Sequence, residues 1–196
     1  MKRWVGGVAI AAALLLGALP GRPALAFEAK DSDAFFFEFG SANIEVRNST
    51  ELLSGESARG GLRLGLFWTF FLEVGYGTVR YSDTVPIAGV KTRIDFRTTG
   101  ANWGLGLMIP IRKVRLGLKY VKNPHNRWSE IQTDDATGTQ VSAIKGNIDF
   151  DSEYVFTQFG EKNWFEIGVR RDLIRNTTSA LENSFGPYIA FNIPLG

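Results

Sequence analysis

The residue types that acid–base or metal chemistry requires are scarce in this sequence. It has one histidine, His125, and no cysteine. Ser129 follows His125 closely, but a general base must reach its nucleophile and also needs a third group to orient it. Asp134 and Asp135 offer only oxygen ligands in a polar segment, where adjacent acids are usually solvated. We therefore expect no enzyme activity, no metal site and no cofactor.

A second set of polar residues is more informative, because its members alternate with apolar or small residues. Alternate residues of an extended chain share one face. We expect these side chains to point into the lumen of a closed barrel. They should pair there, because an unpaired buried charge is strongly destabilising. The predicted network has five basic and five acidic members: Glu38, Arg63, Glu73, Arg115, Lys119, Lys145, Asp149, Glu153, Glu166 and Arg170.

Eight segments with a hydrophobic period of two are predicted to be the strands that position these charges. In one of them, residues 93–109, the apolar residues change parity, so we expect a bulge at residues 99–101. Longer polar loops are expected at residues 47–57, 83–92, 122–141 and 175–183, alternating with tight turns. The predicted strands cover residues 34–46, 58–68, 70–82, 93–109, 114–121, 142–156, 163–174 and 184–193.

The two faces of these strands indicate which solvent each face meets. One face carries large apolar side chains, such as Phe35, Phe37, Leu116 and Ile167, and the other carries glycine and charge. Lipid tolerates no unpaired backbone groups, so a closed barrel is required if the apolar face is outside. The alternative is a soluble barrel with its faces exchanged. Aromatic girdles are expected from Phe35–Phe37, Trp68, Phe70, Phe71, Tyr81, Trp103, Trp128, Phe159 and Trp164.

The N-terminal 26 residues have the pattern of a signal peptide. Lys2 and Arg3 precede an apolar run that Pro20 breaks, and Ala24 and Ala26 are the small residues that a signal peptidase reads. We expect cleavage after Ala26 and a single barrel domain over residues 27–196. The net charge of the whole chain is only +2, and part of its basic excess lies in the expected signal peptide. A nucleic-acid partner is therefore not expected.

The last predicted strand resembles the C-terminal signal that the outer-membrane assembly machinery reads. Its matching residues are Ser184, Gly186, Ile189 and Phe191, although the chain continues for five residues beyond Phe191. Across residues 27–196 the layout resembles the small eight-stranded outer-membrane β-barrel proteins (OmpA-like, OmpX-like or porin-like). The resemblance implies an all-β fold, a closed antiparallel eight-stranded transmembrane β-barrel in the bacterial outer membrane. It also implies contact with outer-membrane lipid and lipopolysaccharide.

Three functions are compatible with such a barrel, and the oligomeric state is not indicated. The first is a structural or surface-interaction role with a charge-filled lumen. The second is a narrow or gated channel for small solutes. The third is an enzyme resembling outer-membrane lipid A deacylases, but Lys122 and Pro124 stand where that family's motif needs histidine and serine.

Overall fold

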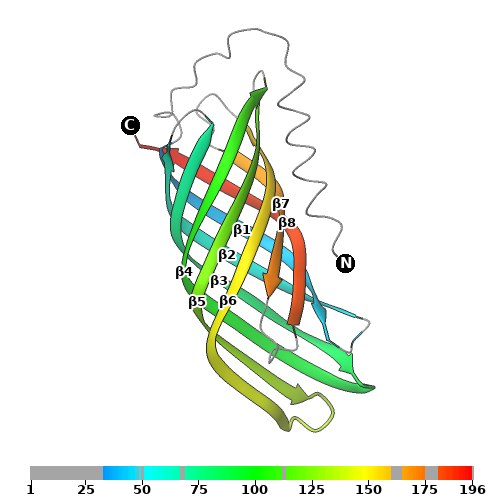
Figure 1. Cartoon of the computed structure of the whole chain (residues 1–196). Helices are drawn as coiled ribbons and strands as arrows, with labels where there is room; N and C mark the ends of the chain where they lie inside the picture. The colour runs from blue at the N-terminus through cyan, green and yellow to red at the C-terminus, as the bar shows by residue number, and fades with distance from the viewer. Residues whose placement is uncertain are drawn as a thin grey trace.

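The computed structural model describes residues 33–47, 49, 51–66, 69–111, 114–159, 165–174 and 181–195. These residues form one closed antiparallel barrel in which each strand pairs with the next and the last pairs with the first (Figure 1). No helix in the described part of the chain is long and apolar enough to cross a membrane. The strands are β1 (Ala34–Val46), β2 (Leu52–Gly65), β3 (Phe70–Ile87), β4 (Val90–Ile111), β5 (Val114–Asp134), β6 (Gln140–Phe159), β7 (Phe165–Ile174) and β8 (Leu181–Pro194).

Two of the predicted loops are wrong, because the chain continues there as strand, and the last residues of the other two, 52–57 and 181–183, belong to β2 and β8. Residues 83–92 form the end of the β3–β4 hairpin, and Ala88 and Gly89 both have positive φ at its tip, at 50° and 85°. Such a pair makes the tight two-residue turn that matches strand twist. Most of residues 122–141 likewise belongs to the β5–β6 hairpin. Both hairpins extend from the end of the barrel opposite the C-terminus (Figure 1).

A register shift lies where the bulge was predicted, but the extra residue is on the neighbouring strand. The β3–β4 register runs through residues 99–101 without a break, whereas the β4–β5 register shifts between Thr99 and Trp103. The extra residue lies in β5, between Asn123 and Asn126, and His125 there has a φ of 51°. Pro124 cannot donate a ladder hydrogen bond, which favours a bulge at this point. As a result, inward-facing residues of β5 have odd numbers before the bulge and even numbers after it.

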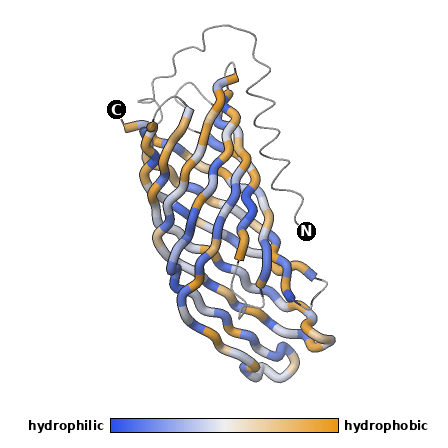
Figure 2. The backbone as a smooth tube through the Cα atoms, viewed as in Figure 1, coloured by the Kyte–Doolittle hydropathy of each residue, from blue (hydrophilic) through white to orange (hydrophobic). Residues whose placement is uncertain are grey.

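The outer wall toward the chain termini is an apolar belt. Exposed side chains of this belt include Phe35, Phe37, Leu105, Ile167 and Phe191. Four aromatic residues predicted for the girdles, Phe36, Phe71, Tyr81 and Trp128, are buried inside the barrel. Trp68 and Trp164 lie outside the described residues. The alternation of hydrophobic and hydrophilic residues along the strands is visible in Figure 2.

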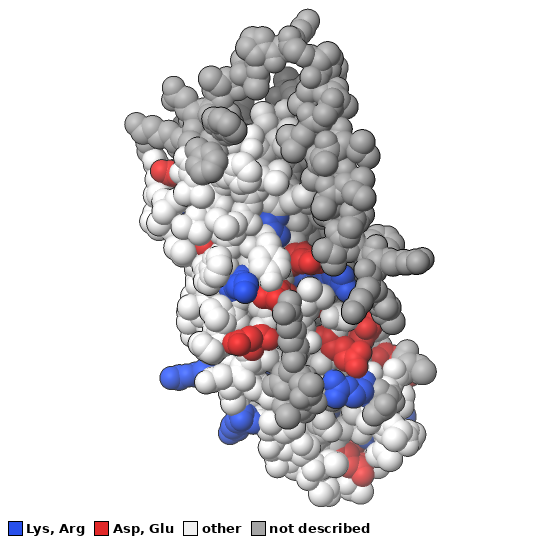
Figure 3. Space-filling view, in the orientation of Figure 1, with Lys and Arg blue, Asp and Glu red and all other residues white. Residues whose placement is uncertain are grey.

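Toward the hairpins the inner face of the barrel becomes apolar and the outer face becomes polar. Inward residues there form an apolar core, whereas the outward residues between them are polar, such as Glu45, Ser54 and Arg93. On the face seen in Figure 3, most charged side chains lie in the middle and lower parts of the barrel. The barrel wall therefore meets lipid near the termini and water near the hairpins. The apolar core comprises Ala42, Ile44, Val46, Leu53, Tyr81, Val85, Ile94, Phe96, Trp128, Ile148, Phe150 and Leu181.

Candidate functional site

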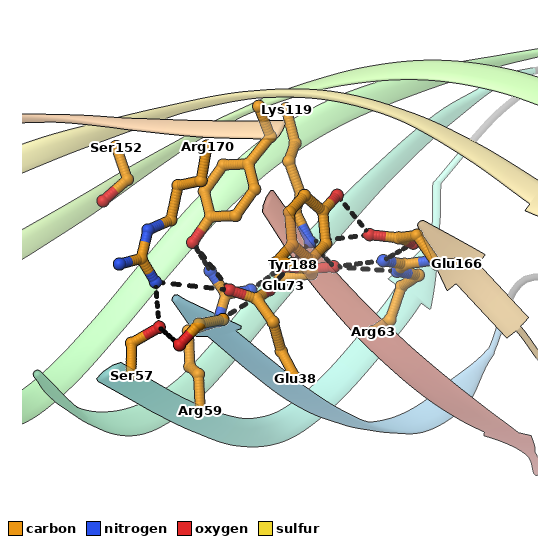
Figure 4. A network of polar contacts seen from close by, with 12 residues as sticks. Glu38, Ser57, Arg59, Arg63, Glu73, Lys119, Ser152, Glu166, Arg170 and Tyr188 are labelled. Carbon is orange, nitrogen blue, oxygen red and sulfur yellow. Dashed lines mark hydrogen bonds and ion pairs between the residues drawn. The ribbon is translucent and has the colours of Figure 1, made fainter. Parts of the chain in front are cut away.

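Eight charged side chains meet inside the barrel at the level of the apolar belt. They come from five strands, and four of them are acidic and four basic. All are buried, and aromatic rings lie against Arg59, Arg63 and Lys119. Figure 4 shows most of them pointing toward one another across the lumen. We call these residues the lumen cluster: Glu38, Arg59, Arg63, Glu73, Lys119, Glu166, Arg170 and Asp172.

Lys119 of β5 is the cation that joins the most carboxylates in the lumen cluster. Its Nζ lies 3.1 Å from Glu38 Oε2, 3.0 Å from Glu166 Oε1 and 3.5 Å from Glu73 Oε1. Nζ also lies 4.4 Å from the centre of the Tyr154 ring. A single ammonium group thus holds together carboxylates from three different strands, β1, β3 and β7.

Arginines of β2 complete the pairing on one side of Lys119. Arg63 Nη2 lies 2.5 Å from Glu73 Oε1 and 2.8 Å from Glu166 Oε2. Arg59 also pairs with Glu73, and its Nε lies 3.8 Å from Glu38 Oε2. The Arg63 guanidinium stacks 4.5 Å from the centre of the Phe71 ring. This contact explains why Phe71 is inside, since an aromatic face stabilises a cation that has left water.

A second centre lies on β7, toward the apolar core. Arg170 Nη2 lies 3.0 Å from Asp172 Oδ2, and Arg170 Nη1 donates to Ser57 Oγ at 2.6 Å. Asp172 accepts two further hydrogen bonds, from Ser152 at 2.7 Å and Ser184 at 2.9 Å. Buried charges are tolerated when hydrogen bonds satisfy their remaining lone pairs and protons, and this carboxylate meets that requirement.

Tyrosine and glutamine side chains donate further hydrogen bonds to the carboxylates of the cluster. The Tyr154 hydroxyl donates to Glu38 at 3.0 Å, and the Tyr188 hydroxyl donates to Glu166 at 2.7 Å. Gln158 Nε2 donates to Glu166 at 3.2 Å. The four acidic and four basic side chains of the lumen cluster therefore pair with one another, and their formal charges sum to zero. Within the described ranges, no group of three or more His, Cys, Asp or Glu residues could hold a metal ion.

The structure brings together six of the ten residues predicted for the lumen. Those six are Glu38, Arg63, Glu73, Lys119, Glu166 and Arg170, and all are buried. Arg115 is only half-buried and lies close to the end of β5 near the termini. The prediction missed Arg59 and Asp172. Arg59 is four residues from Arg63 on β2, and Asp172 is two residues from Arg170 on β7, so alternation alone places each of them on the same face as the predicted arginine.

Three residues predicted for the lumen, all on β6, were wrong. Lys145 and Asp149 are exposed, and Glu153 is half-exposed and pairs with Arg171 across the outer wall at 3.9 Å. On this strand Ile148, Phe150 and Tyr154 face inward. The error arose because the large apolar residues of β6 were assigned to lipid, whereas they fill the apolar core and cover the lumen cluster.

The residues of the predicted assembly signal lie on β8, which closes the barrel against β1. Ser184 and Gly186 face inward, and Ile189 and Phe191 face outward. A side chain at Gly186 would lie 1.9 Å from the Ser41 carbonyl oxygen. Only glycine therefore fits where β8 approaches β1. Recognition by the assembly machinery stays a prediction.

The single histidine lies on the outer surface at the β5 bulge. Its backbone N–H donates to Asp149 Oδ1 at 2.6 Å, and its Nδ1 lies 3.4 Å from the same oxygen. The His125 side chain is 82% exposed. In the described part of the chain it forms no hydrogen bond with a hydroxyl group.

Comparison with known proteins identifies the fold. No protein-family model and no curated protein matches this chain. Among solved structures it is similar to Neisserial surface protein A, with a TM-score of 0.54 and 12% identity over 82% of this chain and 97% of that chain. It also matches Ail, the attachment invasion locus protein of Yersinia pestis, in complex with the heparin analogue sucrose octasulfate, with a TM-score of 0.49 and 11% identity over 82% and 98% of the two chains.

The likeness to Neisserial surface protein A is one of fold, a small eight-stranded β-barrel, and the apolar belt on the closed hydrogen-bonded wall is that of a barrel in the bacterial outer membrane. The predicted fold class and location are confirmed. The predicted signal peptide and its cleavage after Ala26 lie outside the described residues.

Proposed function

We propose that this protein is a closed, non-conducting barrel whose role is structural or lies in surface interactions of its hairpins. The observation that carries the proposal is the lumen cluster. An eight-stranded barrel is just wide enough for its own side chains to fill, and here the side chains of Arg59, Arg63, Glu73 and Lys119 meet across it. The apolar core adds a second barrier between this cluster and the hairpin end.

The orientation of the barrel supports a surface role for its hairpins. Small outer-membrane barrels keep short turns and termini in the periplasm and extend longer connections outward. The ends of β3–β4 and β5–β6 then stand outside the membrane. Exposed apolar residues near these ends, Val90 and Val141 at 51% and 65%, offer contact points for a partner.

We also propose that the protein is not an enzyme. His125 is the only histidine of the chain and is paired with Asp149 on the outer wall. Lys122 and Pro124 occupy the positions that a deacylase motif would need for catalysis. Release of fatty acid from lipopolysaccharide by the purified protein, with loss of that release in His125→Ala, would contradict this proposal.

The channel alternative is tested by solute flux. Liposomes that contain the purified barrel should swell in a small neutral sugar no faster than protein-free liposomes, because the paired charges leave no continuous water path. A general-diffusion porin at the same protein-to-lipid ratio serves as the positive control. Swelling that approaches the porin rate would reject the closed barrel in favour of a channel.

We further propose that β8 is read by the outer-membrane assembly machinery. Phe191→Ala should lower the amount of barrel in the outer membrane of cells while leaving refolding in detergent unchanged, because the motif acts only during assembly. Phe185→Ala is the matched control, since Phe185 is also exposed on β8 but is not one of the matched positions of the motif. Equal membrane levels of the two variants would contradict the proposal.

A further inference from the structure

The outer wall carries a groove across strands β1 to β4. It has a volume of about 430 Å³ and opens to the surroundings. Its shape follows from the register, in which Gly60 lies between Phe37 and Tyr76, and Ala58 lies between Phe39 and Thr78. Small residues therefore form the floor of the groove and aromatic side chains form its sides. The lining residues used in this argument are Phe37, Phe39, Ala58, Gly60, Tyr76 and Arg97.

Two arginines lie side by side at the hairpin end of this groove. Arg80 of β3 is directly opposite Arg97 of β4, and both are exposed on the outer wall. Like charges in directly opposed positions of a sheet destabilise it. In the described ranges neither guanidinium forms an ion pair. Glu56 is opposite Arg80 on the other side, and Ser129 is opposite Arg97.

Further cations extend this positive edge along the wall. Lys145 of β6 is opposite Ser129, so it continues the same row beyond Arg97. Arg127 is opposite Thr99 one row nearer the apolar belt, and it is also exposed. With Glu56 as the one acidic side chain in the row through Arg80 and Arg97, the edge has a net positive charge.

The position of the groove identifies the kind of molecule that would occupy it. Its aromatic sides continue the apolar belt, because the next row toward the termini contains Leu62, Val74 and Trp103. Its arginines lie in the polar part of the wall. An occupant must therefore be apolar at one end and anionic at the other. At the hairpin end of an outer-membrane barrel, the lipid with phosphates directly above its acyl chains is lipid A.

We propose that this groove is a binding site for lipid A, in which an acyl chain lies over Ala58 and Gly60 and a phosphate is bound by Arg80 and Arg97. The planar guanidinium group suits phosphate because it can donate two parallel hydrogen bonds. The arginine pair is then stabilised by the anion between its members. This inference concerns the outer wall and does not depend on whether the lumen conducts.

Binding of bisphosphorylated lipid A to the refolded full chain in detergent tests the site. Replacing both arginines, Arg80→Gln with Arg97→Gln, should weaken binding by roughly tenfold or more, since charge-assisted hydrogen bonds are lost. The matched control, Arg47→Gln with Arg171→Gln, removes the same charge from exposed arginines elsewhere on the barrel. Equal affinities for the two double variants would overturn the proposal.

Two further arms separate the apolar and anionic parts of the site. Gly60→Leu should fill the groove and weaken lipid A binding several-fold without any change in charge, whereas Gly60→Ala, whose added carbon meets nothing closer than 3.4 Å, should not. Removal of both phosphates from lipid A should abolish the difference between wild type and the arginine variant. Binding of inorganic phosphate as tightly as lipid A would overturn the lipid site in favour of a simple anion site. Far-UV circular dichroism checks that every variant is folded.

Discussion

Lys119→Met is expected to lower the free energy of unfolding of the barrel by about 3–5 kcal/mol, the range seen when one partner of a buried ion pair is removed. Methionine is also unbranched and is shorter by one atom, but it leaves Glu38, Glu73 and Glu166 with one cation fewer. Glu38 is affected most, because its other cations, Arg59 and Arg170, lie 3.8 and 3.9 Å away. Urea titration of the barrel refolded in lipid vesicles measures the change.

The lysine on the outer wall provides the control for this experiment. Lys145→Met removes the same charge from an exposed position, and we expect it to change stability by less than about 0.5 kcal/mol. Adding Glu38→Gln to Lys119→Met restores neutrality in the lumen and should recover part of the loss. Equal stabilities for Lys119→Met and Lys145→Met would mean that the lumen charges do not pair as described.

Ile167→Arg is expected to destabilise the barrel in vesicles by roughly 2–4 kcal/mol, the cost of an arginine facing lipid near the midplane. Ile167 is 44% exposed on β7, and Leu116 is 40% exposed on β5. Thr157 of β6 lies directly opposite Leu116 on one side and directly opposite Ile167 on the other, so both residues belong to the same part of the belt. Leu116→Arg should have a similar effect.

The matching substitution in the polar part of the wall should be harmless. Ala143 of β6 is exposed near the β5–β6 hairpin, where we infer that the wall meets water. Ala143→Arg should leave the urea midpoint in vesicles within error of the wild type. If Ile167→Arg and Ala143→Arg had the same stability, the outer wall would not face lipid at Ile167.

Alternation of residue types was sufficient to predict the part of the barrel that has lipid outside and buried charges inside. In β1 and β7 the outward Phe35 and Ile167 and the inward Glu38 and Glu166 follow from a period of two alone. The number and order of the strands followed in the same way. The alternation is clear in the parts of these strands that cross the apolar belt, because the outward side chains there are large and apolar and the inward ones include the charges of the lumen cluster.

The same rule failed where the solvent changes along the strand. The predicted bulge at residues 99–101 would turn Ile94 and Phe96 toward lipid, but both fill the apolar core, as does Ile148 of β6. One sequence does not show where the membrane ends, so it cannot show where the two faces exchange character. The bulge at Pro124 and His125 adds a second difficulty, because the inward residues of β5 are odd-numbered before it and even-numbered after it.

The sequence also could not predict which acidic side chain pairs with which basic one in the lumen, and the reason is different. Lys119 of β5 meets Glu38 of β1 and Glu166 of β7 across the lumen. These strands are not hydrogen-bonded neighbours of β5, so the contacts depend on how far the strands are staggered around the barrel. Parity indicates that a residue points inward but does not indicate its height in the lumen.

Single-channel recording in a planar bilayer tests the central claim, that paired charges close the lumen, most directly. We predict no steady conductance for the wild type across the range of voltages that the bilayer withstands. Arg59→Ala with Arg63→Ala leaves Glu73 without its two arginines, so water should enter to solvate the carboxylate and cation-selective openings should appear. A large, steady conductance of the wild-type barrel, unchanged in the double variant, would contradict the closed lumen.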